Sequence, residues 1–216
     1  MAPKAVGLIL VVMLALLTVS ACGRPAAETE LQPGGITLAD APEVLDLSQF
    51  LPNRFMQRDP VSHGLSKEIV GLSEDSSEVV VFLSVEPYQL LYWFLRVVES
   101  EEDRWDTNLA MYDEDKIKSI MAGYLKAAAT RQGEEDAEPE VLVSYPDIAG
   151  GAILGEGLIE LTEMEMTIRF DMLWLRSCDE MVFVYLYSWS VTEERESLIP
   201  IASEIEHRIA NFTHND

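Results

Sequence analysis

Two neighbouring segments near the C-terminus constrain the fold more than any other part of the chain. In residues 164–175, apolar and polar side chains alternate, which is typical of a β-strand with one buried face. Residues 181–190 follow after a short turn, and both of their alternating sets are apolar, with Phe183 in one set and Val182 in the other. A strand with two apolar faces must be covered on both sides. The sequence therefore predicts an antiparallel β-sheet with helices on both of its faces.

Two segments have the period of amphipathic helices that pack on such a sheet. The first covers residues 113–131, with Asp113 as its expected N-terminal cap. Its apolar stripe consists of Ile117, Ile120, Met121, Tyr124, Leu125 and Ala128. The second helix begins after Ser197, which is its expected cap. Its apolar stripe consists of Leu198, Ile201, Ala202, Ile205, Ile209 and Phe212.

Two further strands are predicted between these helices, at residues 140–145 and 152–161. The second contains Gly155 and Gly157, which indicate a bulge or a bend. The spacing of these two glycines also resembles a fragment of a glycine-rich nucleotide-binding loop. They lead into a strand, however, where a phosphate-binding loop has to open a helix. We therefore interpret both glycines as structural.

The first half of the domain is expected to contain a hairpin and two helices. Residues 67–72 and 78–85 are strand-like runs around a turn-rich pentapeptide, which predicts a hairpin. Residues 88–98 are apolar nearly all round and follow Pro87, a favoured residue in the first turn, so we expect a buried helix there. Residues 45–51 predict a short apolar helix that ends before a proline.

In chain order, these elements form a hairpin, two helices, an antiparallel meander and a closing helix. This order resembles the PsbP-like α/β/α sandwich, the fold of extrinsic photosystem subunits and of some bacterial surface lipoproteins, over about residues 44–212. The resemblance implies the α+β class, with an antiparallel β-sheet flanked by helices. It also implies a role in assembly or binding more often than in catalysis.

The start of the chain predicts where the protein acts. Lys4 precedes an apolar run that is shorter than the roughly 20 residues a membrane-spanning helix needs. The run ends in Val19-Ser20-Ala21-Cys22, which resembles the bacterial lipobox. The resemblance implies a signal peptide over residues 1–21, cleavage before Cys22, and acyl chains such as palmitate on that cysteine. An ordinary secretory signal and an uncleaved anchor are the alternatives, and both also place the domain outside the cytoplasm.

A lipidated Cys22 would hold the protein on the extracytoplasmic face of the cell membrane, since two acyl chains are enough for stable anchoring. Residues 22–43 are rich in small and polar side chains, prolines and glycines, and are expected to form a flexible tether. A single domain then follows over residues 44–216. Cys178 would be the one remaining thiol, so no internal disulfide is expected.

The chain is strongly acidic, with a net charge of −23. Removing residues 1–21, which contain Lys4 and no acidic residue, leaves 14 basic against 38 acidic side chains, a net charge of −24. Such a surface repels phosphate groups and anionic lipid headgroups. We therefore expect no nucleic-acid partner, and contact with the membrane through the lipid on Cys22 alone.

No motif predicts a catalytic site or a cofactor site. Cys178 is followed by two acidic residues, which disfavour a reactive thiolate. The three histidines show no His-x-x-x-His spacing; they are His63, His207 and His214. Glu204 and His207 have the spacing of one helical turn, but further metal ligands are not evident. The chain is therefore not expected to be an enzyme.

Acidic runs at residues 99–103, 113–115 and 134–136 are the remaining candidates for metal binding. They lack the alternating oxygen ligands and the central glycine of a calcium loop. We interpret them as solvated surface, and we predict no metal site.

One group of aromatic residues could line an apolar pocket, although such cross-strand stripes usually belong to the core. The group consists of Phe170, Trp174, Tyr185, Tyr187 and Trp189. Two functions follow from these features. The first is a lipid-anchored binding or assembly module that contacts another envelope protein through a sheet edge or an acidic face. The alternative is a carrier or sensor of a small ligand, with an apolar pocket between sheet and helix.

Overall fold

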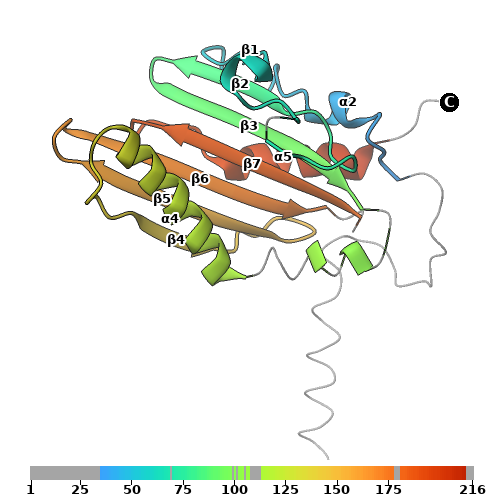
Figure 1. Ribbon diagram of the computed structural model, residues 1–216. Helices are drawn as coiled ribbons and strands as arrows, with labels where there is room; N and C mark the ends of the chain where they lie inside the picture. Colours follow the sequence, from blue (N-terminus) through green and yellow to red (C-terminus); the bar gives the residue numbers. More distant parts are fainter. Residues whose placement is uncertain are drawn as a thin grey trace, which may run out of the picture. The chain divides into compact units, whose positions relative to one another are not determined.

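A seven-stranded antiparallel β-sheet forms the centre of the described part of the chain, in the order β1-β2-β3-β7-β6-β5-β4 (Figure 1). The computed structural model describes residues 35–68, 70–98, 100, 102–104, 106–107, 113–177 and 181–212. The strands are β1 (Met56–Arg58), β2 (Val80–Val85), β3 (Tyr88–Val97), β4 (Glu140–Ser144), β5 (Ala152–Leu161), β6 (Met166–Arg176) and β7 (Val182–Ser190). The helices are α2 (Ala41–Leu45), the 3₁₀ helix η1 (Pro60–His63), α4 (Glu114–Arg131) and α5 (Leu198–Asn211). The predicted α+β class is confirmed.

Helices α2 and α5 pack on one face of the sheet, and the predicted apolar stripe of α5 lies in this core. Its buried members are Leu198, Ile201, Ala202, Ile205 and Ile209. They pack with side chains of β3, β6 and β7, among them Trp93, Leu173 and Leu186. Ser197 caps α5 as expected, because its Oγ accepts a hydrogen bond from the backbone N–H of Ile199 at 3.3 Å.

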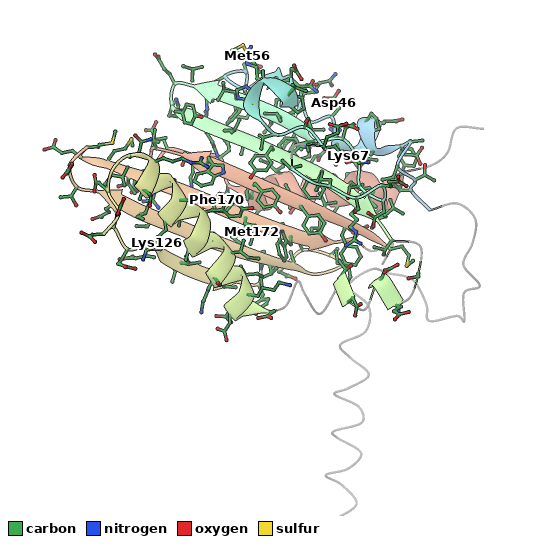
Figure 2. All side chains as sticks on the ribbon, viewed as in Figure 1. Asp46, Met56, Lys67, Lys126, Phe170 and Met172 are labelled. Carbon is green, nitrogen blue, oxygen red and sulfur yellow. The ribbon has the colours of Figure 1, made fainter. Side chains whose placement is uncertain are left out.

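Helix α4 packs on the opposite face of the sheet, over β4, β5 and β6. Its cap is confirmed, because the Asp113 carboxylate accepts a hydrogen bond from the backbone N–H of Lys116 at 3.0 Å. The buried side of the helix consists of Ile117, Met121, Leu125 and Ala129. Figure 2 shows Phe170 and Met172 on the sheet on this side, in the core that they share with α4. Tyr124, predicted in the buried stripe, is instead 54% exposed at the edge of the helix.

The glycines of β5 have a different role from the predicted one. Pairing with β6 continues without a bulge through Gly155, opposite Met172, and Gly157, opposite Phe170. A Cβ atom on Gly157 would lie 2.8 Å from Leu125 Cδ1. These positions therefore lack a side chain because α4 lies directly on the strand.

The prediction of a helix over residues 88–98 is wrong, since this segment forms strand β3 between β2 and β7. Leu91, Trp93 and Leu95 face the core beneath α5, while Tyr92 and Phe94 lie on the face that carries α4. The strand is apolar on both faces because one face packs in the core beneath α5 and the other carries aromatic rings that stack on those of β7. Its apolar run therefore has the all-round pattern of a buried helix.

Two smaller predictions for the first half of the domain are also wrong. The described residues between 67 and 72 form turns and irregular structure instead of a strand, and β2 pairs with β3 and β1. The short helix expected over residues 45–51 lies instead at Ala41–Leu45, where it forms α2. The packed part of the chain also extends ahead of Val44, because Ile36 and Ala41 are buried in the core beneath α5.

Candidate binding surface

Seven aromatic side chains of β3, β6 and β7 form a continuous layer on the face of the sheet that carries α4. We call this layer the aromatic face; it consists of Tyr92, Phe94, Phe170, Trp174, Tyr185, Tyr187 and Trp189. The strand register places Tyr92 directly opposite Tyr187, and Phe94 directly opposite Tyr185. Because successive side chains of a strand point to opposite faces, the aromatic residues at every second position of β7 lie on the same face.

The rings of the aromatic face stack on one another across the strands. The ring centroids of Tyr92 and Tyr187 are 4.9 Å apart at an interplanar angle of 13°, and those of Phe94 and Tyr185 are 5.0 Å apart at 19°. Phe170 stacks on Trp189 at 4.3 Å and joins the two groups through Tyr187 at 6.1 Å. Such pairs contribute about 0.5–1.5 kcal/mol each beyond the burial of their area. The stacking therefore gives the aromatic face a fixed arrangement of rings.

Helix α4 covers only one side of this layer. It packs over β4, β5 and β6, so that β3 and β7 lie beside it (Figure 1). Phe170 is only 1% exposed beneath the helix, whereas the other six rings remain partly exposed. Tyr124 of α4 approaches Phe170 edge-on at 5.4 Å and forms a rim beside the layer. The aromatic face is therefore core at Phe170 and becomes an accessible surface toward β3.

The interface directly beneath α4 is closely packed. Ile117, Met121 and Leu125 are fully buried against the sheet, and the glycines of β5 admit no side chain there. The part of the sheet that a ligand or partner could contact is consequently beside α4, on β3 and β7.

The aromatic face is uncharged. Burial raises the pKa of the Tyr92, Tyr185 and Tyr187 hydroxyls above the ordinary value, so that all three stay protonated at physiological pH. The Tyr187 hydroxyl also accepts a hydrogen bond from Trp174 Nε1 at 3.3 Å. In a chain with a net charge of −23, an uncharged aromatic layer favours contact with apolar groups.

An ion pair lies at the Tyr185 end of the layer. Arg96 Nε is 2.6 Å from a carboxylate oxygen of Asp75, and Arg96 Nη1 also donates a hydrogen bond to Thr107 Oγ1 at 3.4 Å. Burial alone would raise the pKa of Asp75, but hydrogen bonds from Ser73 and Arg96 outweigh it and lower that pKa. Arg96 and Asp75 therefore neutralise each other beside the rings.

The other predicted candidates do not come together in a site. Glu204 pairs with Arg208 at 2.9 Å, while His207 contacts Asn211, so Glu204 and His207 form no metal pair. Glu134 accepts hydrogen bonds from two backbone N–H groups of the β5–β6 turn. His63 lies at the end of η1. Cys22, Cys178 and His214 lie outside the described residues.

The described part of the chain contains neither a metal-binding cluster nor a membrane-spanning helix. No group of three or more His, Cys, Asp or Glu side chains there is arranged to hold a metal ion. None of the helices in the described ranges combines the length and the apolar character that crossing a membrane requires.

Sequence reasoning missed two parts of the structure around the sheet. Tyr92 and Phe94 fall in the segment predicted to be a helix, and its nearly all-apolar run contains no alternation that could have placed them opposite β7. On the other face, Arg195 Nε donates to the buried Asp171 carboxylate at 2.7 Å and also contacts Glu156. No local pattern predicts this cluster, because Arg195 comes from the loop after β7.

No model of a known protein family matches the chain, and comparison with curated proteins gives no match either. A function for the chain is therefore inferred from its own residues and their geometry.

Proposed function

We propose that the protein is a lipid-anchored binding module on the extracytoplasmic face of a cell membrane, and that the aromatic face is its binding surface. One observation carries the proposal: six stacked or edge-packed rings of β3, β6 and β7 remain partly exposed, mainly beside the part of the sheet that α4 covers. Covering apolar area yields roughly 25 cal/mol per Å², and aromatic residues are common anchors of protein interfaces. The partner in this proposal is another envelope protein that presents apolar side chains.

The start of the chain supports the membrane location in this proposal. Residues 19–22 resemble a lipobox, so that Cys22 would carry the acyl chains and residues 1–21 would be removed. The PsbP-like sandwich is the fold to which we assign the domain, and an antiparallel sheet with helices packed on both faces supports that assignment. The high negative charge agrees with a domain that touches the membrane only through its lipid.

The binding surface is tested with two matched variants in a pull-down from detergent-solubilised membranes. Tyr124→Glu places a charge on the rim of the aromatic face, while Phe50→Glu replaces an exposed ring outside the aromatic face with a charge. We expect wild type and Phe50→Glu to recover the same protein, and Tyr124→Glu to recover about tenfold less. Equal recovery by both variants would show that the aromatic face is not the surface. Recovery of no partner by the wild type would contradict the module itself.

The exposed rings of β7 also favour a second function, the carriage of a small apolar ligand. Tyr187 and Trp189 are partly exposed next to the Tyr124 rim, an arrangement that suits a flat apolar molecule. Titration with the uncharged fluorophore N-phenylnaphthylamine tests it. Saturable binding that Tyr124→Glu weakens and Phe50→Glu preserves would support a carrier. Lack of saturable binding would reject the carrier and leave the protein partner.

The anchor is tested by replacing the cysteine. Cys22→Ser removes the thiol that the acyl chains require, so we expect the variant to leave the membrane fraction with its domain folded. Retention of Cys22→Ser in that fraction would contradict the lipobox and point to an uncleaved apolar helix.

A further inference from the structure

Among the described strands, β4 is an outer strand of the sheet and pairs with β5 alone. Among the described residues, no backbone hydrogen bond reaches the outer side of Glu140–Ser144. A strand in this position presents unpaired N–H and C=O groups, which can pair with another extended chain. The opposite outer strand, β1, has only three residues and is soon followed by Pro60. Of the two edges, β4 is therefore the less protected.

The side chains of β4 add an apolar contact to this edge. Val141 and Val143 pack beneath α4, so Leu142 points to the other face of the sheet. Helix α5 packs over β6 and β7 on that face and leaves β4 uncovered, and Leu142 is 73% exposed. Leu158, partly exposed on β5, is its diagonal neighbour. An added strand could therefore pack an apolar side chain on Leu142.

The charge around β4 indicates what kind of strand would pair there. Glu135, Asp136, Glu138 and Glu140 are all exposed at its N-terminal end. Among these four, the described residues supply one ion pair, between Glu138 and Lys126 at 2.9 Å. A second copy of the chain, with its own net charge of −23, would bring more negative charge to this edge. A segment that carries lysine or arginine would instead be attracted.

We propose that β4 accepts an extended, basic segment of another protein, which adds to the sheet as an eighth strand with apolar side chains on Leu142 and basic ones near Glu140. Main-chain hydrogen bonds supply affinity in this mode, and the alternating side chains supply specificity. This edge is formed by residues outside the aromatic face, so the two surfaces can be tested separately.

The experiment uses synthetic peptides of about six residues, the usual length of a strand. One alternates threonine with valine and lysine, so that valine and lysine lie on the same face of the added strand, as Leu142 and Glu140 do on β4; the second has the same composition in blocks, and the third has glutamate in place of lysine. Binding is followed by hydrogen exchange of the β4 amides. We expect the alternating basic peptide to slow exchange at residues 140–144 by about tenfold, and the other two to leave it unchanged. If the block peptide slowed exchange equally, the interaction would depend on net charge alone, and strand addition would be overturned.

Three variants locate the interaction. Leu142→Lys places a cation on the exposed position, and we expect it to weaken binding of the basic peptide by about tenfold. Glu140→Gln is a milder change that should leave the domain folded, and we expect it to weaken binding of the basic peptide less. Val61→Lys is the matched control on exposed η1, and Tyr124→Glu tests the aromatic face; neither should change peptide binding. Unchanged binding by Leu142→Lys, or a dimer that forms through β4 in sedimentation equilibrium, would overturn the proposal.

Discussion

The thioether sulfur of Met121 lies over the backbone of Gly155, in the space that a Cβ atom on Gly155 would occupy. Leu125 stands in the same relation to Gly157 one pair further along β5. Both helix residues are fully buried, so neither has free space to move into. This close approach holds α4 against β5 and leaves the rings of β3 and β7 beside the helix.

Gly155→Ala is expected to destabilise the protein by about 1–3 kcal/mol, because the added methyl group overpacks the interface with Met121. Chemical denaturation measures the loss. In a Met121→Ala background the same substitution should cost less, since the clash is removed. Gly123→Ala is the control: nothing lies within 4 Å of its Cβ position in α4, so alanine should stabilise the helix by up to about 1 kcal/mol. Equal effects of the two alanines would refute the packing argument.

Two partly buried tyrosines of the aromatic face predict a loss of stability at alkaline pH. Burial raises the pKa of Tyr92 and Tyr187 in the folded protein, so above about pH 10 the unfolded chain releases protons that the folded chain retains. Stability should therefore fall as the pH rises from that value. Tyr92→Phe should flatten this fall in thermal unfolding, whereas Tyr88→Phe, at an exposed position, should leave it steep. Tyrosinate absorbance that appears near pH 10 for every tyrosine of the folded protein would contradict the assignment.

Asp75 predicts the opposite dependence at acid pH. Its pKa is lowered in the folded protein, chiefly by hydrogen bonds from Ser73 and Arg96 that overcome its burial. Its contribution to stability is present above the unfolded pKa of about 3.9 and is lost as the pH falls through the lower folded value. Asp75→Asn should thus cost about 1–2 kcal/mol at neutral pH and less in acid. Glu138→Gln, in an exposed pair, should cost under about 1 kcal/mol at either pH, and a pH-independent cost of Asp75→Asn would contradict the ion pair.

The C-terminal half of the fold was predictable because most of its elements show the period of a strand or of an amphipathic helix. Strand β5 begins and ends where the sequence predicted, and α5 buries the predicted stripe. Strand β3 was not predictable in the same way, because a run that is apolar on both faces has no period that separates strand from helix. Gln89, its one buried polar side chain, is satisfied by Glu196 from a distant loop, which no local pattern indicates.

The aromatic face was predictable only in part for the same reason. Alternation in β6 and β7 identified five of its rings, whereas Tyr92 and Phe94 depended on the assignment of β3. Which rings are core and which are accessible depends on where α4 crosses the sheet. That position is set by long-range packing on Gly155 and Gly157, and it cannot be predicted from the amphipathic stripe of α4 alone.

The pair of Arg195 and Asp171 predicts a stability defect that acid relieves. Burial raises the pKa of Asp171 even with Arg195 at 2.7 Å. Arg195→Met would leave this carboxylate buried without its cation, and we expect a loss of about 3 kcal/mol at neutral pH. Because the folded pKa of Asp171 then lies further above its unfolded value, the variant should regain stability as the pH falls from neutral toward the unfolded pKa.

Adding Asp171→Asn to Arg195→Met should restore part of the loss at neutral pH. Arg169→Met, which breaks a pair with the exposed Glu193, should cost under about 1 kcal/mol. Urea unfolding across the pH range measures all four proteins, and a loss for Arg195→Met that neither acid nor Asp171→Asn relieves would show that Arg195 acts through packing instead of charge.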